Sequence, residues 1–353
     1  MPARAKTGPS LARLVKMAIP IFSDAQRQCP RKGPGRPPEF PDWKIAVLML
    51  VAILKSRKSK SAQYRYLHEH RHKLKRWLGL KSLPCRTTYF DRYRGMKRLL
   101  EMAVRIQGGK AVKEGFVVAT NVAVDKTCIR ARGAPWHRRG GRQCRKSPGV
   151  DAQAGWGYSQ HHGWVYGYGL EIVATVTANS LVFPLIASAD AANVNERRSF
   201  LDKADKLPAS TRNVLADSGY DSNAAAESIE RRPDGRATGR RFVCPMQRRP
   251  GNVKVGRYPA RGRRGRLRQH RRDRLAFYES PPGRRLYRQR KRIEPFHDWF
   301  KGRFQLAQRA WHRGLRNNQT QLLTAVFAYQ LLVRYNCQRG QINGQVQWIL
   351  DCL

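Results

Sequence analysis

The chain has 353 residues, of which 70 are Lys or Arg and 24 are Asp or Glu, so its formal net charge is +46. The hydrophobic fraction of 41%, with 8 Trp, 13 Tyr and 12 Phe, excludes a disordered basic tail, which would lack the aromatic residues of a core. A folded body this cationic argues against an ordinary enzyme of small metabolites, and it favours a polyanionic partner, nucleic acid above all.

The cysteines and the apolar runs argue against three further classes of protein. The seven cysteines are odd in number and include no C-x-x-C pair, so neither a disulfide framework nor a zinc ribbon is indicated. The longest apolar run, residues 45–54, has about half the length of a membrane-spanning helix. We therefore expect a cytoplasmic protein associated with the nucleoid, with no membrane partner.

The positive charge is concentrated in two segments. Residues 1–100 carry 24 basic and 5 acidic residues, and residues 231–292 carry 23 basic and 3 acidic residues. The rest of the chain has a net charge of only +7. This distribution predicts cationic binding surfaces attached to a nearly neutral core.

The first segment, residues 1–110, is predicted to be a helical, basic DNA-binding region. Helices are expected at 42–54, 61–77 and 86–104. In the third, aromatic and aliphatic residues recur at helical spacing, which leaves Arg86 and Arg92 for the outer face, as in a helix that lies in a DNA groove. A solvated basic helix in a small bundle explains the same pattern.

A short motif precedes these helices. The stretch 31–38 reads RKGPGRPP and resembles the Gly-Arg-Pro core of minor-groove AT-hooks, with Arg36 as the residue that would enter the groove. A linker rich in Pro and Gly accounts for the same residues.

Beyond residue 110 the pattern predicts a mixed α/β sheet flanked by helices, divided by an insertion. The first part of this core is placed at 111–245, and the Arg- and Gly-rich stretch 246–286 is expected to be a basic insertion that is disordered or rests on a ligand. The C-terminal helices of the core follow at 287–353. The predicted strands are 116–124, 164–176, 181–187, 213–216 and 241–244, of which the second and third are expected to form a hairpin around residues 178–180. The predicted helices are 195–206, 222–229, 287–306 and 318–335.

Two acids follow apolar runs in a chain that is poor in acids. Asp125 ends VAVD and Asp217 ends NVLAD, so each is expected at a strand terminus, where a sheet presents groups to a ligand. A single Asp at such a position is more often a turn or helix cap, so the pair alone does not decide between the two roles.

The expected helix 287–306 carries a third acid within a charged face. At about 100° per residue, Tyr287, Arg290, Glu294 and Lys301 fall within about 60° of one another, apart from a stripe of Ile and Phe. An exposed, salt-bridged face explains Arg290 and Glu294 but gives no reason for the whole set.

The spacing Y-x2-R-x3-E-x6-K of these four residues resembles the signature of bacterial insertion-sequence transposases of the DDE type. Asp125 in VAVDKT is similar to the first acid of that family, although Lys126 stands between it and Thr127, and Asp217 in LADSGYD closely resembles the second. The resemblance extends from about residue 118 to residue 301.

The resemblance implies an RNase H-like fold in which Asp125, Asp217 and Glu294 are the catalytic and metal-binding acids. It implies two Mg²⁺ ions, with Mn²⁺ as the alternative, because phosphodiester cleavage uses paired divalent ions held by oxygen ligands. Double-stranded DNA, as terminal repeats and as target, is the implied partner of a homodimer. The residues expected to bind it are Tyr287, Arg290, Lys301, Arg36, Arg86 and Arg92.

Three functions remain open from the sequence. The first is a transposase that cuts at the ends of its element and joins the 3′ ends to target DNA. The second is a non-catalytic nucleic-acid-binding protein, such as a decayed transposase. The third is an RNase H-like nuclease or resolvase, which would use the same three acids without strand transfer.

Overall fold

A computed structural model describes residues 9–30, 38–136, 149–159, 162–232, 234–246 and 262–353, with the backbone alone for 262–268. The predicted AT-hook stretch, including Arg36, and residues 247–261 of the predicted insertion lie outside the described residues. No helix among the described residues is long and apolar enough to cross a membrane.

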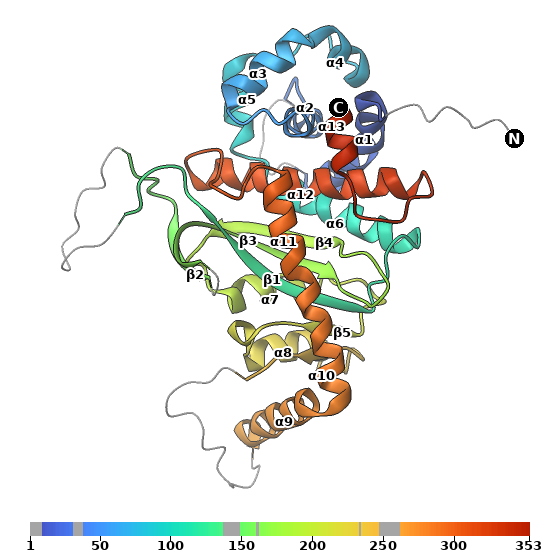
Figure 1. Cartoon of the computed structure of the whole chain (residues 1–353), viewed down its shortest axis with the longest axis vertical. Helices are drawn as coiled ribbons and strands as arrows, with labels where there is room; N and C mark the ends of the chain where they lie inside the picture. The colour runs from blue at the N-terminus through green and yellow to red at the C-terminus, as the bar shows by residue number, and fades with distance from the viewer. Residues whose placement is uncertain (1–8, 31–37, 137–148, 160–161, 233, 247–261) are drawn as a thin grey trace, which may run out of the picture.

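The described residues form one six-stranded sheet with helices on both sides (Figure 1), which confirms the mixed α/β architecture. Its order is β2-β3-β1-β5-β6, and β4 pairs with β3 beside β2. The strands are β1 (Asn121–Arg130), β2 (Gly155–Ser159), β3 (Gly163–Thr175), β4 (Pro184–Ala191), β5 (Asn213–Leu215) and β6 (Arg241–Val243).

The sheet is antiparallel on one side of β1 and parallel on the other. β1 pairs with β3 in antiparallel register, and β3 pairs with β4 in the same way, which confirms the hairpin expected around residues 178–180. β1 and β5 are parallel, as are β5 and β6. β2 was not predicted, because its sequence GWGYS contains no apolar run; it pairs with the first part of β3.

β1 ends later than predicted, and this corrects the expected position of Asp125. The apolar run stops at Val124, but the strand continues to Arg130 because β3 supplies antiparallel partners throughout. Asp125 therefore lies inside the strand. Since side chains alternate across a sheet, Asp125 and its partner Ile172 share one face, and Lys126 and Glu171 share the other.

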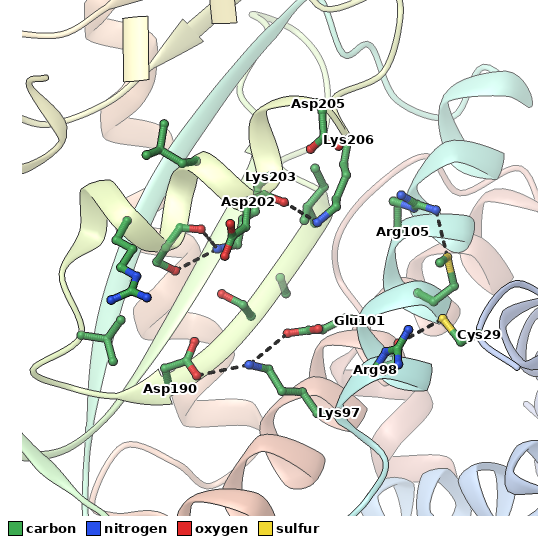
Figure 2. A pocket seen from close by; sticks show the side chains of 18 residues that line it. Cys29, Lys97, Arg98, Glu101, Arg105, Asp190, Asp202, Lys203, Asp205 and Lys206 are labelled. Atoms are coloured by element: carbon green, nitrogen blue, oxygen red, sulfur yellow. Dashed lines mark hydrogen bonds and ion pairs between the residues drawn. The ribbon is translucent and has the colours of Figure 1, made fainter. Parts of the chain in front are cut away.

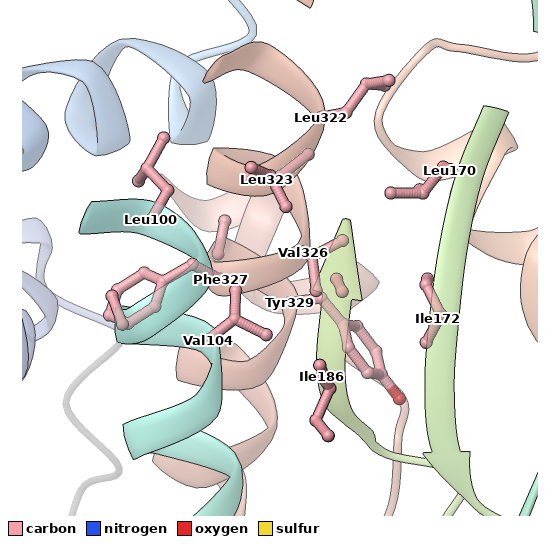
Figure 3. Close-up of a cluster of buried hydrophobic side chains, with 14 of the residues drawn as sticks. Leu100, Val104, Leu170, Ile172, Ile186, Leu322, Leu323, Val326, Phe327 and Tyr329 are labelled. Carbon is pink, nitrogen blue, oxygen red and sulfur yellow. The ribbon is translucent and has the colours of Figure 1, made fainter. Parts of the chain in front are cut away.

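The face of the sheet that carries Asp125 is covered by α11 and α12. α12 (Leu315–Cys337) is buried on nearly all sides and packs against α6 (Lys97–Lys113) and β4. Figure 3 shows Val326 of α12 directed toward the sheet and Phe327 directed away from it, where its ring packs against Phe22 at a centroid distance of 4.3 Å. The amide of Gln330, at the centre of this contact, donates to the carbonyl oxygens of Val104 (3.0 Å) and Pro184 (2.8 Å) and so ties the two layers together.

The N-terminal helices share this core. α1 (Leu11–Gln28) and α2 (Asp42–Leu54) pack against each other, α1 also packs on α6, and α2 packs on α12. The predicted helix at 42–54 is therefore present, whereas 61–77 is divided into α3 (Lys60–Glu69) and α4 (Arg71–Leu78). The predicted helix 86–104 is divided near Gly95 into α5 (Arg86–Tyr93) and α6, and the predicted domain limit at residue 110 falls inside α6.

The opposite face and the parallel edge of the sheet carry α7 (Glu196–Ala204), the 3₁₀ turn η1 (Ser218–Tyr220) and α8 (Asn223–Glu230). Part of the predicted insertion is helical: α9 (Gly262–Glu279) packs against α10 (Pro281–Arg288) and β6. The chain then runs through the 3₁₀ turn η2 (Gln289–Arg292) into α11 (Ile293–Arg303), which crosses in front of the sheet in Figure 1. The chain ends with α13 (Gln347–Cys352).

Candidate active site

The register of the sheet places Asp125 and Asp217 beside each other. In the parallel pair of β1 and β5, Ala123 is opposite Leu215, and each aspartate lies two residues further along its own chain. Neighbouring strands are about 4.8 Å apart, so two residues at the same offset from a paired position emerge side by side. The first two acids therefore meet where β5 ends.

The turn that carries Asp217 is held from several directions. Its Oδ1 accepts a hydrogen bond from Gly219 N (2.8 Å), so the capping role expected of a single Asp is present here as well. The thiol of Cys244 lies 2.9 Å from Asp217 O, and Tyr220 OH donates to Glu171 Oε2 at 3.0 Å. These contacts fix the position of Asp217 relative to the end of β6 and to β3.

The third acid reaches the site through a helix that is broken where the sequence predicted a continuous one. Tyr287 lies in α10, Arg290 in η2, and Glu294 and Lys301 in α11. Pro295 explains the break, because it lacks a backbone N–H and its ring would clash with the carbonyl group four residues earlier, that of Lys291. It is tolerated here because it stands in the first turn of α11, where that donor is not needed.

Arg290 lies between the first and the third acid. Its Nη1 is 3.6 Å from Asp125 Oδ1, and its Nη2 is 3.2 Å from Glu294 Oε1. Only 15% of the Arg290 side chain is exposed, against 44% for Glu294. The structure thus brings Asp125 and Glu294 to one guanidinium group, which binds the acids of the chain itself.

The pKa of Asp125 reflects its burial and the charges of its neighbours. Burial raises the pKa of Asp125 to about 7; the positive charge of Arg290 opposes this shift, and the negative charges of Asp217 and Glu294 add to it. A carboxylate responds in this way when like charges share its site. The three acids therefore form one electrostatic group.

His297 is a member of the site that the sequence analysis missed. It is 3% exposed, its Nε2 lies 3.5 Å from Asp125 Oδ2, and neither ring nitrogen has a hydrogen-bond partner among the described residues. Burial, and secondarily the charge of Lys301, lowers the pKa of His297 to about 3, so the ring is neutral. The available signal was its spacing, three residues after Glu294 and four before Lys301 on the same helix.

The other two residues of the signature lie near the acids but are half-buried or buried. The ring of Tyr287 packs against that of Tyr278 at a centroid distance of 5.0 Å, and burial raises the pKa of Tyr287 to about 12. Lys301 is 9% exposed and its Nζ lies 3.0 Å from Asp298 Oδ1. Tyr287 interacts with Arg290, and the charge of Lys301 acts on His297, so each is linked to the acids through a neighbour of Asp125.

The two predicted DNA-binding arginines of α5 differ in environment. Arg86 is exposed, and its guanidinium lies 5.2 Å from the centroid of the Phe90 ring. Arg92 is turned inward: it forms a salt bridge with Asp42, donates to Phe40 O at 3.0 Å, and has a side chain that is 14% exposed. This differs from the outer-face position expected for Arg92, because Asp42 at the start of α2 offers it a partner within the bundle.

Residues 119–331 match the family described as the transposase DDE domain. The match covers more than half of the chain and contains Asp125, Asp217 and Glu294 in that order. The chain belongs to the DDE transposase family. No curated protein matches this transposase.

The acids of this DDE transposase have the donor chemistry of a site for hard divalent cations. Carboxylate oxygens are the ligands that Mg²⁺ prefers. Among the described residues, however, no three His, Cys, Asp or Glu side chains converge closely enough to hold a metal ion. The acids of the transposase are neighbours, and the Arg290 guanidinium stands between two of them.

A cleft of the transposase lies elsewhere, between α6, β4 and α7 (Figure 2). Its walls carry charges of both signs, and Lys97 bridges Asp190 (3.2 Å) and Glu101 (3.7 Å) across it. None of the three acids of the family motif lines this cleft. We therefore place the candidate active site at the acid group and not in this cleft.

Proposed function

We propose that this transposase cuts phosphodiester bonds at the ends of an insertion sequence and joins the freed 3′ ends to target DNA, using Asp125, Asp217 and Glu294. The proposal is supported by two observations: Asp125 and Asp217 follow paired positions of β1 and β5, and Arg290 lies close to both Asp125 and Glu294. An RNase H-like fold is supported by the order β4-β3-β1-β5-β6, antiparallel before β1 and parallel after it.

The three carboxylates would hold Mg²⁺, two ions in the full site, with Mn²⁺ as the alternative. Bound divalent ions supply activation of the attacking hydroxyl group and stabilisation of the leaving oxygen. Support comes from the all-oxygen donor set and from the position of Glu294, which shares the Arg290 guanidinium with Asp125.

Arg290, Lys301 and Tyr287 would bind the phosphates that flank the scissile bond. Arg290 can form two parallel hydrogen bonds with a phosphate, whereas Lys301 acts as a point charge. Because Arg290 binds two carboxylates in the structure, phosphate and carboxylate would compete for the same guanidinium group. If the Arg290 guanidinium moved to a DNA phosphate, Asp125 and Glu294 would be released to bind the cation.

The basic N-terminal helices would bind the terminal repeats, and the second basic segment would bind flanking or target DNA. The N-terminal helices and α9 lie at opposite ends of the long axis, with β1 and α11 between them (Figure 1). We propose that Arg86 and Arg36 belong to the first contact surface. We further propose that the protein acts on nucleoid DNA as a homodimer that holds two element ends.

The test is a strand-transfer assay with Mg²⁺, DNA that carries the ends of the element, and a plasmid target. We expect joined products from the wild-type protein, and Glu294→Gln should lower their formation by at least about a thousandfold, because it removes one carboxylate from the reacting centre. Glu227→Gln, a half-buried glutamate on α8, is the control and should retain activity.

The outcomes of this assay separate the alternatives. Nicked but unjoined DNA would indicate a nuclease or resolvase. Salt-sensitive binding with neither nicking nor joining would indicate a non-catalytic DNA-binding protein. Full activity of Glu294→Gln would contradict the assignment of the three acids.

A further inference from the structure

His297 is a polar residue at a position of α11 whose buried neighbours are apolar. It is buried with Ile293, Phe296 and Phe300 of the same helix, and its ring centroid lies 5.8 Å from that of Phe296. Only 3% of His297 is exposed, and neither ring nitrogen has a hydrogen-bond partner among the described residues. Buried polar groups are nearly always satisfied, so an unsatisfied one beside an active-site acid indicates a partner that it reaches in another state of the protein.

The unsatisfied ring faces one oxygen of Asp125. His297 Nε2 lies 3.5 Å from Asp125 Oδ2, which is beyond the usual hydrogen-bond distance but close enough for a bond to form after a small movement of either side chain. The neutral ring carries a single N–H, and a carboxylate only accepts hydrogen bonds. With its hydrogen on Nε2, His297 is therefore placed to become a donor to Asp125.

The other oxygen of Asp125 has a different neighbour. Oδ1 lies 3.6 Å from Arg290 Nη1, and Nη2 of the same guanidinium lies 3.2 Å from Glu294 Oε1. In the proposed reaction Arg290 moves to a DNA phosphate, whereas His297 stays in place because α11 packs against β1. Once Arg290 has left, the donors that remain beside Asp125 include His297 and the backbone N–H of Lys126.

We propose that His297 is a positioning residue of this reaction. In the complex with DNA it donates from Nε2 to Asp125 Oδ2. This hydrogen bond fixes the carboxylate so that Oδ1, the oxygen on the side of Arg290 and Glu294, is directed to the reacting centre. The inference rests on the proposed function, because it assigns a role within the same acid group. The alternative is that His297 only fills space in the packing of α11.

The test begins with His297→Phe, which keeps a buried ring and removes both nitrogens. In the strand-transfer assay its kcat should fall by about tenfold to a hundredfold, the loss typical of a residue that orients a ligand of the reacting centre. The KM for end DNA should not change, because the buried ring does not reach the DNA. In EDTA the variant should unfold at the temperature of the wild type or above it, because no unsatisfied nitrogen remains buried.

Two amide variants identify the nitrogen that acts. His297→Gln places an amide where Nε2 was, and the shorter side chain of His297→Asn places one where Nδ1 was. His297→Gln should restore kcat toward the wild-type value, because its amide can donate to Asp125, and His297→Asn should not. Equal recovery in the two variants would mean that donation from Nε2 is not the cause, and would overturn the proposal.

His312→Phe is the matched control, because it makes the same change at a buried histidine that has a partner. His312 is 5% exposed, and its Nε2 lies 3.2 Å from Tyr93 OH. His312→Phe should therefore unfold at a lower temperature than the wild type and keep the wild-type kcat. The same pattern in His297→Phe, or simply a wild-type kcat, would establish the space-filling role and overturn the proposal.

Glu294→Gln in the same assay distinguishes this failure from a failure of the proposed function. If Glu294→Gln abolishes joining and His297→Phe does not lower it, only the role of His297 is wrong. If Glu294→Gln retains full activity, the acid group is not the reacting centre, and both proposals are wrong.

Discussion

At the scale of single residues, the arginines of this transposase divide into those committed to acids of the chain and those that remain exposed. Arg290 binds Asp125 and Glu294, and Arg92 binds Asp42, although the sequence assigned both to DNA. Composition and helical periodicity show that an arginine is available on a face. They do not show which carboxylate, distant in the sequence, the folded chain brings to it.

Arg92 provides the first test of this division. Arg92→Ala should lower the free energy of unfolding by about 1–3 kcal/mol, because it leaves the half-buried Asp42 without its donor. Arg86→Ala removes an exposed side chain and should change stability by less than about 0.5 kcal/mol while weakening DNA binding. Urea unfolding measures the stability of each variant, and titration with DNA measures its DNA binding. If Arg92→Ala is as stable as the wild type and binds DNA as poorly as Arg86→Ala, Arg92 binds DNA and is not committed to Asp42.

His312 makes stability depend on pH. It is 5% exposed, its Nε2 lies 3.2 Å from Tyr93 OH, and burial, with Lys60 and Arg132 nearby, lowers its pKa to about 3. In the unfolded chain the pKa of His is about 6.5, so below pH 6.5 the unfolded state binds the extra proton. Stability is therefore lost as the pH falls, by about 2 kcal/mol from this residue between pH 7 and pH 5.

The non-titrating variant His312→Gln measures this contribution. Its stability relative to the wild type should improve by about 2 kcal/mol as the pH is lowered from 7 to 5. Urea unfolding at several pH values gives the difference. A difference that does not change with pH would show that His312 is not held neutral in the folded protein.

At the scale of elements, the close approach of α6 to β4 supports the interface between the helical layer and the sheet. A Cβ atom on Gly108 would lie 2.8 Å from Leu185 O and 2.9 Å from Leu185 Cα, whereas one on the next residue, Gly109, would meet nothing within 4 Å. A side chain at position 108 would therefore clash with β4, whereas a side chain at position 109 would not.

Alanine substitutions at these two glycines test the interface. Gly108→Ala should destabilise the protein by about 1–3 kcal/mol, because α6 and β4 must separate. Gly109→Ala should stabilise it by up to about 1 kcal/mol through helix propensity. Thermal unfolding of both variants is the measurement, and equal effects would mean that α6 does not approach β4 so closely.

The elements also show what the sequence could predict and what it could not. The hairpin of β3 and β4 and the helix α2 were predictable, since each is a long apolar run with clear limits. The end of β1 was not, because its last residues are polar and belong to the strand only through their pairing with β3. α1 was missed as well; it contains Pro20, which normally argues against a helix interior.

The sequence predicted which acids form the candidate site, but it did not predict how the residues around them are arranged. The spacing of Tyr287, Arg290, Glu294 and Lys301 identified the family and the third acid, even though the chain there is two helices joined by a 3₁₀ turn. His297 escaped notice, because it belongs to no pattern until the fold places it beside Asp125.

At the scale of the whole molecule, the N-terminal helices and α9 lie at opposite ends of the long axis, and β1 and α11, which carry Asp125 and Glu294, lie between them (Figure 1). The N-terminal segment is joined to the sheet through the core that α1, α2, α6 and α12 share, so its position relative to the acids is fixed by packing. DNA bound along this axis would pass the acid group. A rigid scaffold of this kind can hold a scissile phosphate in place for reaction.

The central claim, that Asp125, Asp217 and Glu294 form one metal site, is tested most directly by a crystal structure of the protein with Mn²⁺ and end DNA. Anomalous scattering locates the Mn²⁺ ions. We predict Mn²⁺ within about 2.0–2.3 Å of oxygens from all three acids, with Arg290 moved onto a phosphate. Mn²⁺ bound elsewhere, or Glu294 still paired with Arg290 and directed away from the ion, would contradict the claim.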